Sequence, residues 1–429
     1  MDISKKRESF GLIFINMLVC FYLYMALVGV LLSKGSEVGL AISGLMFVMT
    51  IYYGLISNEF RFSFSSIYLF IIFVFFLILL TSNKYLFSYR MWLKMSMGML
   101  ALPLGFNIFH CENNIQKYWR NLIIIVHIYI IYIILANFFH FGGGYGKEDL
   151  DFETGNLFAE ALFSNVYILT MVPFFIRYNG SRTYTLLIMS IAATLIIVNM
   201  KRTPIACGVV SVMAIVFVLY YLNVKYGIIR SDISSKKYVV AFLLLFGCSF
   251  LYFQDTIEMQ IENRMKRFQE GSMEKEGRVK ELMYIYEENV ENGDLIKMLF
   301  GKETFNIVGT YANGKFGKRQ IHEDYGMLLH STGVVGLFWY LGIQVFLLVL
   351  PYWRRFNVLF IHNQENRLLL AIYSSLIIIH FISMTSGVIR MPFSEMIYYM
   401  TLGLILRIFY ENYHDYIESN SQTTLEKGI

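Results

Sequence analysis

The sequence contains few charged residues for its length. Charged residues make up 16% of the 429 residues and hydrophobic residues 56%, whereas a soluble domain carries roughly 25% charge. The mean hydropathy is +0.53. This composition excludes an ordinary soluble domain and indicates a polytopic membrane protein. The formal net charge of +5 calls for no nucleic-acid partner, because the basic residues cluster in short loops, as membrane insertion requires.

Cysteine and metal-ligand patterns are sparse as well. The cysteines all lie in or next to apolar runs, at Cys20, Cys111, Cys207 and Cys248. A disulfide framework or a cysteine-held metal is therefore not expected. None of the 8 histidines pairs with cysteines or carboxylates at metal-ligand spacing, so we predict neither a protein-held metal nor a cofactor.

Long apolar runs predict an all-α polytopic membrane protein with about 12 transmembrane helices. The first run follows Lys5, Lys6 and Arg7, and it is long enough to span the bilayer without a cleavage site typical of a signal peptide. The predicted spans lie near 10–32, 38–57, 64–81, 92–109, 119–141, 157–176, 184–200, 203–223, 238–254, 325–350, 368–388 and 393–410.

Basic residues predict the orientation and the division of the chain. They concentrate in alternate loops, which places both termini in the cytoplasm and the long polar segment 255–324 on the outer face. Residues 1–254 then form an N-terminal bundle of about nine helices. Residues 325–429 supply about three more helices and a cytoplasmic tail.

The long outer loop is predicted to contain two amphipathic helices that lie on the bilayer. The first runs from Thr256 to Phe268, with apolar residues at helical spacing and basic residues elsewhere on its surface. The second has an apolar stripe at Val279, Leu282, Met283, Tyr286 and Val290.

The sequence Lys201-Arg202-Thr203-Pro204 predicts a helix start beside an arginine. Thr203 is the predicted N-cap and Pro204 the predicted first helical residue. Free amides, the positive end of the helix dipole and the Arg202 guanidinium would together bind an anion. The alternative is an arginine that reaches to the membrane interface without a catalytic role.

Two further features of the outer loop suggest a site. Arg278 lies in the first turn of the second amphipathic helix, where a cation suits an arriving anion. His322 precedes Glu323 and Asp324 at the mouth of an apolar helix. An imidazole beside carboxylates suits a general base or a phosphate ligand, although an ordinary loop histidine is the alternative.

These segments resemble the O-antigen ligase and polymerase superfamily in sequence order and in topology. The matching segments span residues 200–345: KRTP with Arg202, EGRVKELMYIYEE with Arg278, LFGKETFNIVG with Gly301, and HEDYGMLLHSTGVVGLFWYLG with His322. Two departures stand out. Glu323 replaces the usual Asn after the histidine, and Thr-Pro follows Arg202 where small residues are usual. The segment ETGNLFAEAL at 153–162 is similar to a further block but lacks its proline.

The resemblance implies a GT-C-like glycosyltransferase in the bacterial cytoplasmic membrane. Its donor would be a glycan on undecaprenyl diphosphate at the outer face, and its acceptor a glycan hydroxyl. Arg202 and Arg278 would hold the diphosphate, because a guanidinium pairs bidentately with phosphate, and His322 would accept the acceptor's proton or assist the leaving group. A lipid diphosphate leaves readily, so no metal is demanded. The remaining residues expected to bind substrate are Lys201, Glu323, Asp324 and Tyr325.

Three functions compete at this stage. A polysaccharide polymerase, for O-antigen, capsule or exopolysaccharide, would use a second lipid-linked repeat unit as acceptor and could work with a chain-length regulator. A ligase would transfer the finished glycan to lipid A-core or another acceptor. A transporter or flippase should show internal repeats and charged residues in mid-span. The sequence shows no obvious internal repeat, and the suspected site lies in an outer loop. Glu323 or Asp324 could replace His322 as the base.

Overall fold

The computed structural model describes residues 3–31, 41, 44–49, 51–52, 72, 74, 86–139, 158–176, 182–198, 201–226, 258, 277–302 and 321–426. Within these ranges every regular element is helical. The long helices are α1 (Ile3–Leu31), α4 (Leu86–Ile108), α5 (Glu112–Phe139), α6 (Phe158–Phe175), α7 (Arg182–Val198), α8 (Arg202–Lys225), α13 (Asp324–Trp353), α15 (Gln364–Ser383) and α16 (Pro392–Glu426). The short ones are α11 (Gly277–Tyr286), η2 (Glu287–Glu291), α12 (Leu295–Phe300), η4 (Phe356–Val358), α14 (Leu359–His362), η5 (Met384–Ser386) and η6 (Val388–Arg390).

Five helices of the described chain are long and apolar enough to cross a membrane. They are Phe10–Leu27, Glu112–Phe139, Thr203–Lys225, Asp324–Trp353 and Gln364–Ser386. This confirms the helical membrane class in its general form. The predicted spans 38–57, 64–81 and 238–254 lie wholly or largely outside the described residues, and each remaining predicted span overlaps a helix. The total of about 12 spans therefore stays a prediction.

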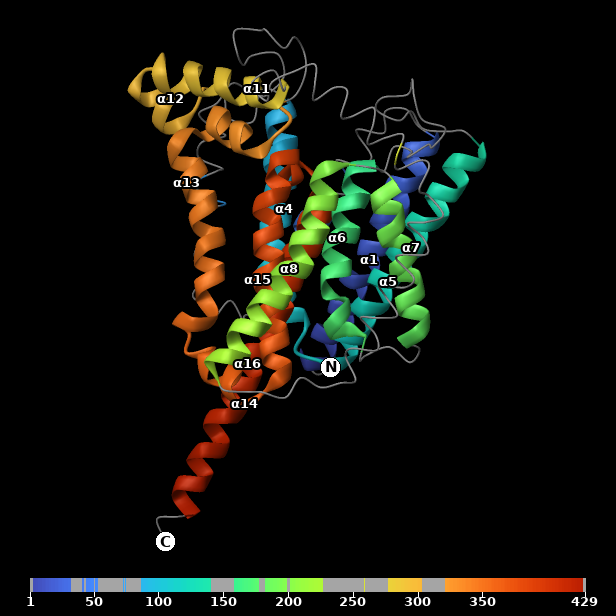
Figure 1. Ribbon diagram of the computed structural model, residues 1–429, viewed down its shortest axis with the longest axis vertical. Coiled ribbons are helices and arrows are strands. Elements are labelled where there is room, and N and C mark those ends of the chain that lie inside the picture. Colours follow the sequence, from blue (N-terminus) through green and yellow to red (C-terminus); the bar gives the residue numbers. More distant parts are fainter. Residues whose placement is uncertain are drawn as a thin grey trace.

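The long helices run side by side, whereas α11 and α12 lie across one end of the bundle (Figure 1). The start of α1 and the end of α16 lie at the other end. This arrangement agrees with the predicted separation of the termini from the long loop. Which end faces the cytoplasm stays a prediction. The first predicted amphipathic helix, Thr256–Phe268, falls outside the described residues except at position 258.

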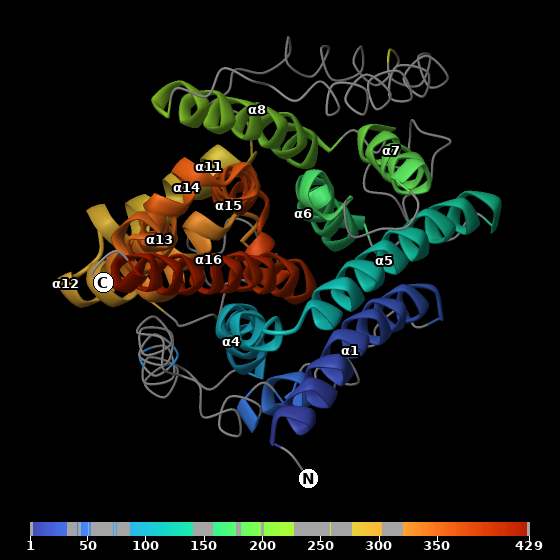
Figure 2. The same cartoon turned by 90° about the horizontal axis from the view of Figure 1, so that it is seen from below.

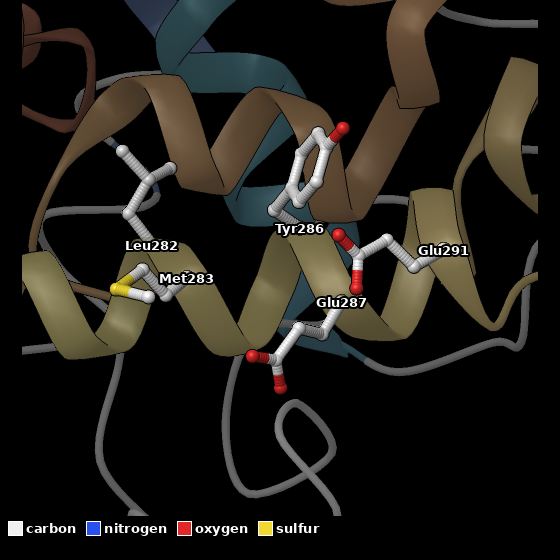
Figure 3. A pocket seen from close by; sticks show the side chains of 5 residues that line it. All are labelled: Leu282, Met283, Tyr286, Glu287 and Glu291. Carbon is white, nitrogen blue, oxygen red and sulfur yellow. The ribbon is translucent and has the colours of Figure 1, made fainter.

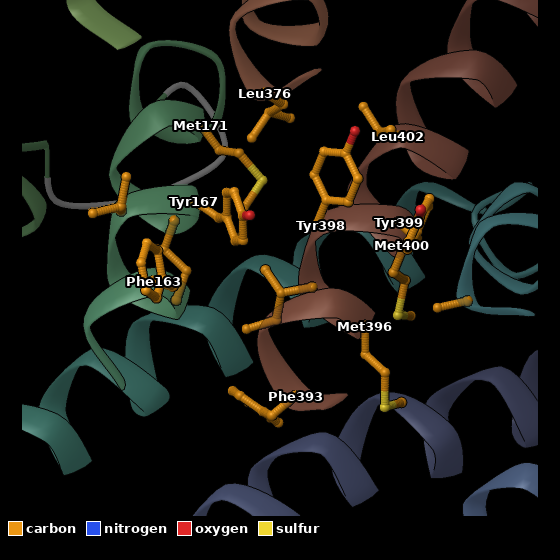
Figure 4. Close-up of a cluster of buried hydrophobic side chains, with 14 of the residues drawn as sticks. Phe163, Tyr167, Met171, Leu376, Phe393, Met396, Tyr398, Tyr399, Met400 and Leu402 are labelled. Atoms are coloured by element: carbon orange, nitrogen blue, oxygen red, sulfur yellow. The ribbon is translucent and has the colours of Figure 1, made fainter. Parts of the chain in front are cut away.

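The core forms where α4 packs along α16, α8 along α15 and α1 along α5; Figure 2 shows the last pair side by side. Its centre is built of aromatic and methionine side chains (Figure 4), whose large or adaptable surfaces fill the space between helices. Labelled members include Phe163, Tyr167, Met171, Leu376, Met396 and Met400, all of them buried.

The outward face of α8 is apolar, as expected for a helix that contacts lipid. Between Val209 and Val224 its exposed side chains repeat at helical spacing and are hydrophobic: Val209, Val212, Met213, Val216, Phe217, Tyr220, Tyr221 and Val224. The exposed Lys225 follows at the end of the helix. A water-exposed helix would carry polar residues on this face. The contiguous apolar surface therefore supports the membrane assignment.

Helix α13 consists of two helical pieces that meet in a kink at Gly333, whose φ is 66°. The kink brings the chain against the end of α12. A Cβ at Gly333 would lie 2.4 Å from the Leu299 carbonyl carbon and oxygen, and Lys302 N donates to the His330 carbonyl at 2.9 Å. Glycine is needed here for both the positive φ and the close approach. The kink thereby fixes α12 against the first part of α13.

Candidate functional site

The start of α8 lies where the sequence places an anion site, but its cap differs from the prediction. Lys201, with φ −75° and ψ 119°, is the N-cap, and Arg202 is the first helical residue. Helix α8 thus begins two residues before the predicted first residue, Pro204. The Thr203 hydroxyl instead accepts a hydrogen bond from Ser386 Oγ at 2.6 Å, which ties this helix start to η5. The Arg202 side chain lies outside the described residues.

The second predicted amphipathic helix is present as α11 followed by η2, with Arg278 as the second residue of α11. The Arg278 side chain is not among those described. The predicted apolar stripe is largely exposed: Val279 is 41% exposed and Met283 52%. The opposite face, which an amphipathic helix would turn to water, is buried through Glu281, Ile285 and Asn289. The carboxylate on this buried face, that of Glu281, contacts His322.

Glu281 is the carboxylate that contacts His322. Its Oε2 accepts a hydrogen bond from the His322 backbone N–H at 3.1 Å, and its Oε1 lies 3.8 Å from His322 Nδ1. Glu281 is fully buried, whereas the His322 side chain is 35% exposed. The imidazole is therefore partly open to solvent, whereas the Glu281 carboxylate beside it is buried.

The two carboxylates next to His322 in sequence stabilise local structure instead. Glu323 is the N-cap of α13, and its Oε1 accepts from Gly326 N at 2.8 Å. Asp324 is completely buried, and its Oδ2 accepts from Ile389 N at 2.9 Å. Asp324 Oδ1 has no hydrogen-bond partner among the described residues. A role for either carboxylate as the base or in substrate binding stays a prediction.

Arg390 is a neighbour of His322 that the sequence did not reveal. Its Nη2 donates to the His322 carbonyl at 2.9 Å, and its guanidinium interacts electrostatically with Asp324. The side chain folds over Gly387, where an added Cβ would lie 2.0 Å from Arg390 Nη2. Gly387 also has a φ of 76°. In the sequence, Arg390 follows Ser-Gly near the start of an apolar run. This pattern is common and does not indicate a functional residue by itself.

These contacts bring four distant segments to one end of the bundle. Ser386 links to the start of α8, Arg390 links to His322, and His322 links to α11 through Glu281. Tyr325, predicted to bind substrate, is half-buried, and its hydroxyl donates to the Phe381 carbonyl at 2.7 Å. The segment with Arg278 therefore contacts His322 through Glu281, whereas the segment with Arg202 is linked to Ser386, four residues before Arg390.

A depression of about 440 Å³ lies on the outer face of α11 and η2. It is lined by Leu282, Met283, Tyr286, Glu287 and Glu291 (Figure 3). None of the predicted site residues lines it. In the described part of the chain, no group of three or more His, Cys, Asp or Glu side chains is placed to hold a metal ion.

Comparisons of the chain with protein-family models, with curated proteins and with solved structures find no match. The helices and their apolar outer faces define the class, a helical membrane protein. The more specific assignment rests on the sequence resemblance and on the arrangement around His322.

Proposed function

We propose that the protein is a polysaccharide polymerase of the bacterial cytoplasmic membrane. It would transfer a glycan from undecaprenyl diphosphate to a hydroxyl of a second lipid-linked repeat unit at the outer face. The observation that carries this proposal is the meeting of the α8 start, α11 and His322 at one end of the bundle. These are the segments that the family resemblance assigns to diphosphate binding and proton transfer.

In this scheme His322 accepts the proton of the attacking hydroxyl. Glu281 lies nearest to Nδ1 and orients the ring, so that Nε2 is the nitrogen that exchanges the proton with substrate. Partial exposure of the imidazole allows substrate access, and the buried Glu281 restricts its motion. In this scheme Glu281, and not the adjacent Glu323 or Asp324, is the carboxylate that supports His322.

Arg202 and Arg278 bind the diphosphate and stabilise the charge that develops on it as the glycosidic bond breaks. The start of α8 adds free backbone amides, which favour an anion at this position. Arg390 holds the His322 backbone and is a positioning residue in this scheme. Metal ions are not required, because the lipid diphosphate is already a good leaving group.

The polymerase proposal is preferred over transport. Ionisable residues in mid-span would favour a transporter, but the buried pair His380 and Glu395 lies near the ends of α15 and α16. No substrate path through the bundle follows from their position.

Reconstitution tests the proposal directly. Purified protein in lipid vesicles receives a synthetic undecaprenyl-diphosphate-linked repeat, and product length is read on a gel. A polymerase yields a ladder from this donor alone, with release of undecaprenyl diphosphate. A ligase yields product only after lipid A-core or another acceptor is added. Absence of any glycan transfer under both conditions would refute the assignment.

A further inference from the structure

A pair of buried ionisable side chains lies inside the bundle close to the end that carries the candidate site. His380 is in the last turn of α15, and Glu395 is in the first turn of α16. Their exposed fractions are 0% and 2%, and His380 Nδ1 lies 3.6 Å from Glu395 Oε1. Buried ionisable residues in a membrane bundle are energetically costly and often functional. The proposed transfer reaction uses neither of them.

Hydroxyl groups contact both ring nitrogens of His380. Tyr340 Oη lies 3.0 Å from Nε2, and Tyr167 Oη lies 3.1 Å from Nδ1. Tyr167 Oη is in turn 3.0 Å from Ser383 Oγ. Ser383 is 1% exposed, and its Oγ donates to the His380 carbonyl at 2.8 Å. The hydroxyl groups next to His380 are therefore enclosed in the bundle together with it.

The hydroxyl of Tyr340 lies close to both members of the pair, 3.0 Å from His380 Nε2 and beside the Glu395 side chain. Gln344 Nε2 donates to Tyr399 Oη at 2.6 Å, and Tyr399 donates to Tyr340 Oη at 3.2 Å. Because a hydroxyl can donate or accept, Tyr340 can bond to the pair in either of its protonation forms.

Glu395 Oε1 has no hydrogen-bond partner among the described residues. No Lys or Arg in the described chain forms an ion pair with this carboxyl group, whose ionic contact is His380. A carboxylate beside a neutral imidazole would leave an uncompensated charge in the interior, which is costly. One proton shared by the pair removes this net charge, as a carboxylic acid with imidazole or as a carboxylate with imidazolium.

We propose that His380 and Glu395 form a buried proton-binding site that holds one shared proton. The Tyr398 ring stacks on His380 at 4.1 Å and 6°, which shields one face of the imidazole. Helix α4 packs on Glu395 through Gly98. The polar groups near the pair are Tyr167 of α6, Cys207 of α8, Asp324, Tyr340 and Gln344 of α13, Ser383 of α15, and Tyr398 and Tyr399 of α16. The site does not depend on the transferase assignment.

Spectroscopy of the full-length protein in lipid nanodiscs tests the shared proton. We expect either an infrared band of a protonated carboxyl that disappears in Glu395→Gln, or an imidazolium NMR signal from labelled histidine that disappears in His380→Gln. Glu418→Gln is the control, because it changes an exposed carboxylate on the same helix. A carboxylate at Glu395 together with a neutral imidazole at His380 would overturn the proposal.

A milder variant keeps this test decisive where Glu395→Gln or His380→Gln does not fold. Tyr340→Phe retains the ring and removes only the hydroxyl next to His380 Nε2. It should shift the carboxyl band or the imidazolium signal, because a hydrogen bond to the pair is lost. Signals identical to those of the wild type would contradict the shared proton.

Discussion

Glu281→Gln isolates the effect of one buried carboxylate on the candidate catalytic histidine. The amide keeps the size of the side chain and an oxygen that can accept from His322 N, but it removes the negative charge 3.8 Å from Nδ1. Two unit charges at about 4 Å interact by about 4 kcal/mol at an effective dielectric constant near 20. Since His322 is 35% exposed, solvent screening reduces the expected contribution to about 1 kcal/mol.

This contribution should appear in the rate of glycan transfer, because a general base becomes positively charged when it accepts a proton. A loss of about 1 kcal/mol corresponds to about a fivefold lower rate for Glu281→Gln. His322→Ala should reduce the rate by about 10²–10⁴-fold. Initial rates of undecaprenyl diphosphate release from the reconstituted protein measure both effects. Glu291→Gln is the control, because Glu291 is exposed in the same segment.

The double variant separates a direct effect of Glu281 from one that acts through His322. Residues in contact are expected to be coupled, so Glu281→Gln should cause no further loss in the His322→Ala protein. A fivefold loss in that background as well would show that Glu281 acts independently of His322. Wild-type rates from His322→Ala itself would remove His322 from the mechanism.

The remaining predictions concern the neighbouring arginines and the topology. Arg202→Lys should lose most transfer activity, because a point charge does not reproduce the bidentate fork; a wild-type product ladder at equal protein level would favour the interfacial-anchor alternative. Gly387→Ala should displace the Arg390 guanidinium and lower the free energy of unfolding by about 1–2 kcal/mol, because position 387 has a positive φ. Gly342→Ala should behave as the wild type, because nothing lies within 4 Å of its added Cβ. Equal melting curves for the two variants would contradict this account. Reporter fusions at Val290, Phe360 and Asn420 should give an external signal at the first position alone, and an external signal at either of the others would break the orientation argument.

The sequence predicted the helices well because their signal is local. An apolar run of sufficient length forms a helix in lipid whatever its partners are, since the backbone must satisfy its own hydrogen bonds. The same local logic predicted a helix start beside Arg202 and a second amphipathic helix after Arg278. It failed on the cap, because the Thr203 hydroxyl bonds to Ser386, a residue that no local pattern connects to it.

The sequence by itself determined the helical membrane class and a set of candidate residues around His322. Only the tertiary structure decided their partners. Glu281 is 41 residues from His322, and Arg390 is 68 residues from it, so neither contact follows from spacing along one helix. Glu323 is adjacent to His322 in sequence, yet it caps the start of α13 and its carboxylate accepts from Gly326 N. Packing of separate helices, which depends on the whole fold, selected which carboxylate the histidine contacts.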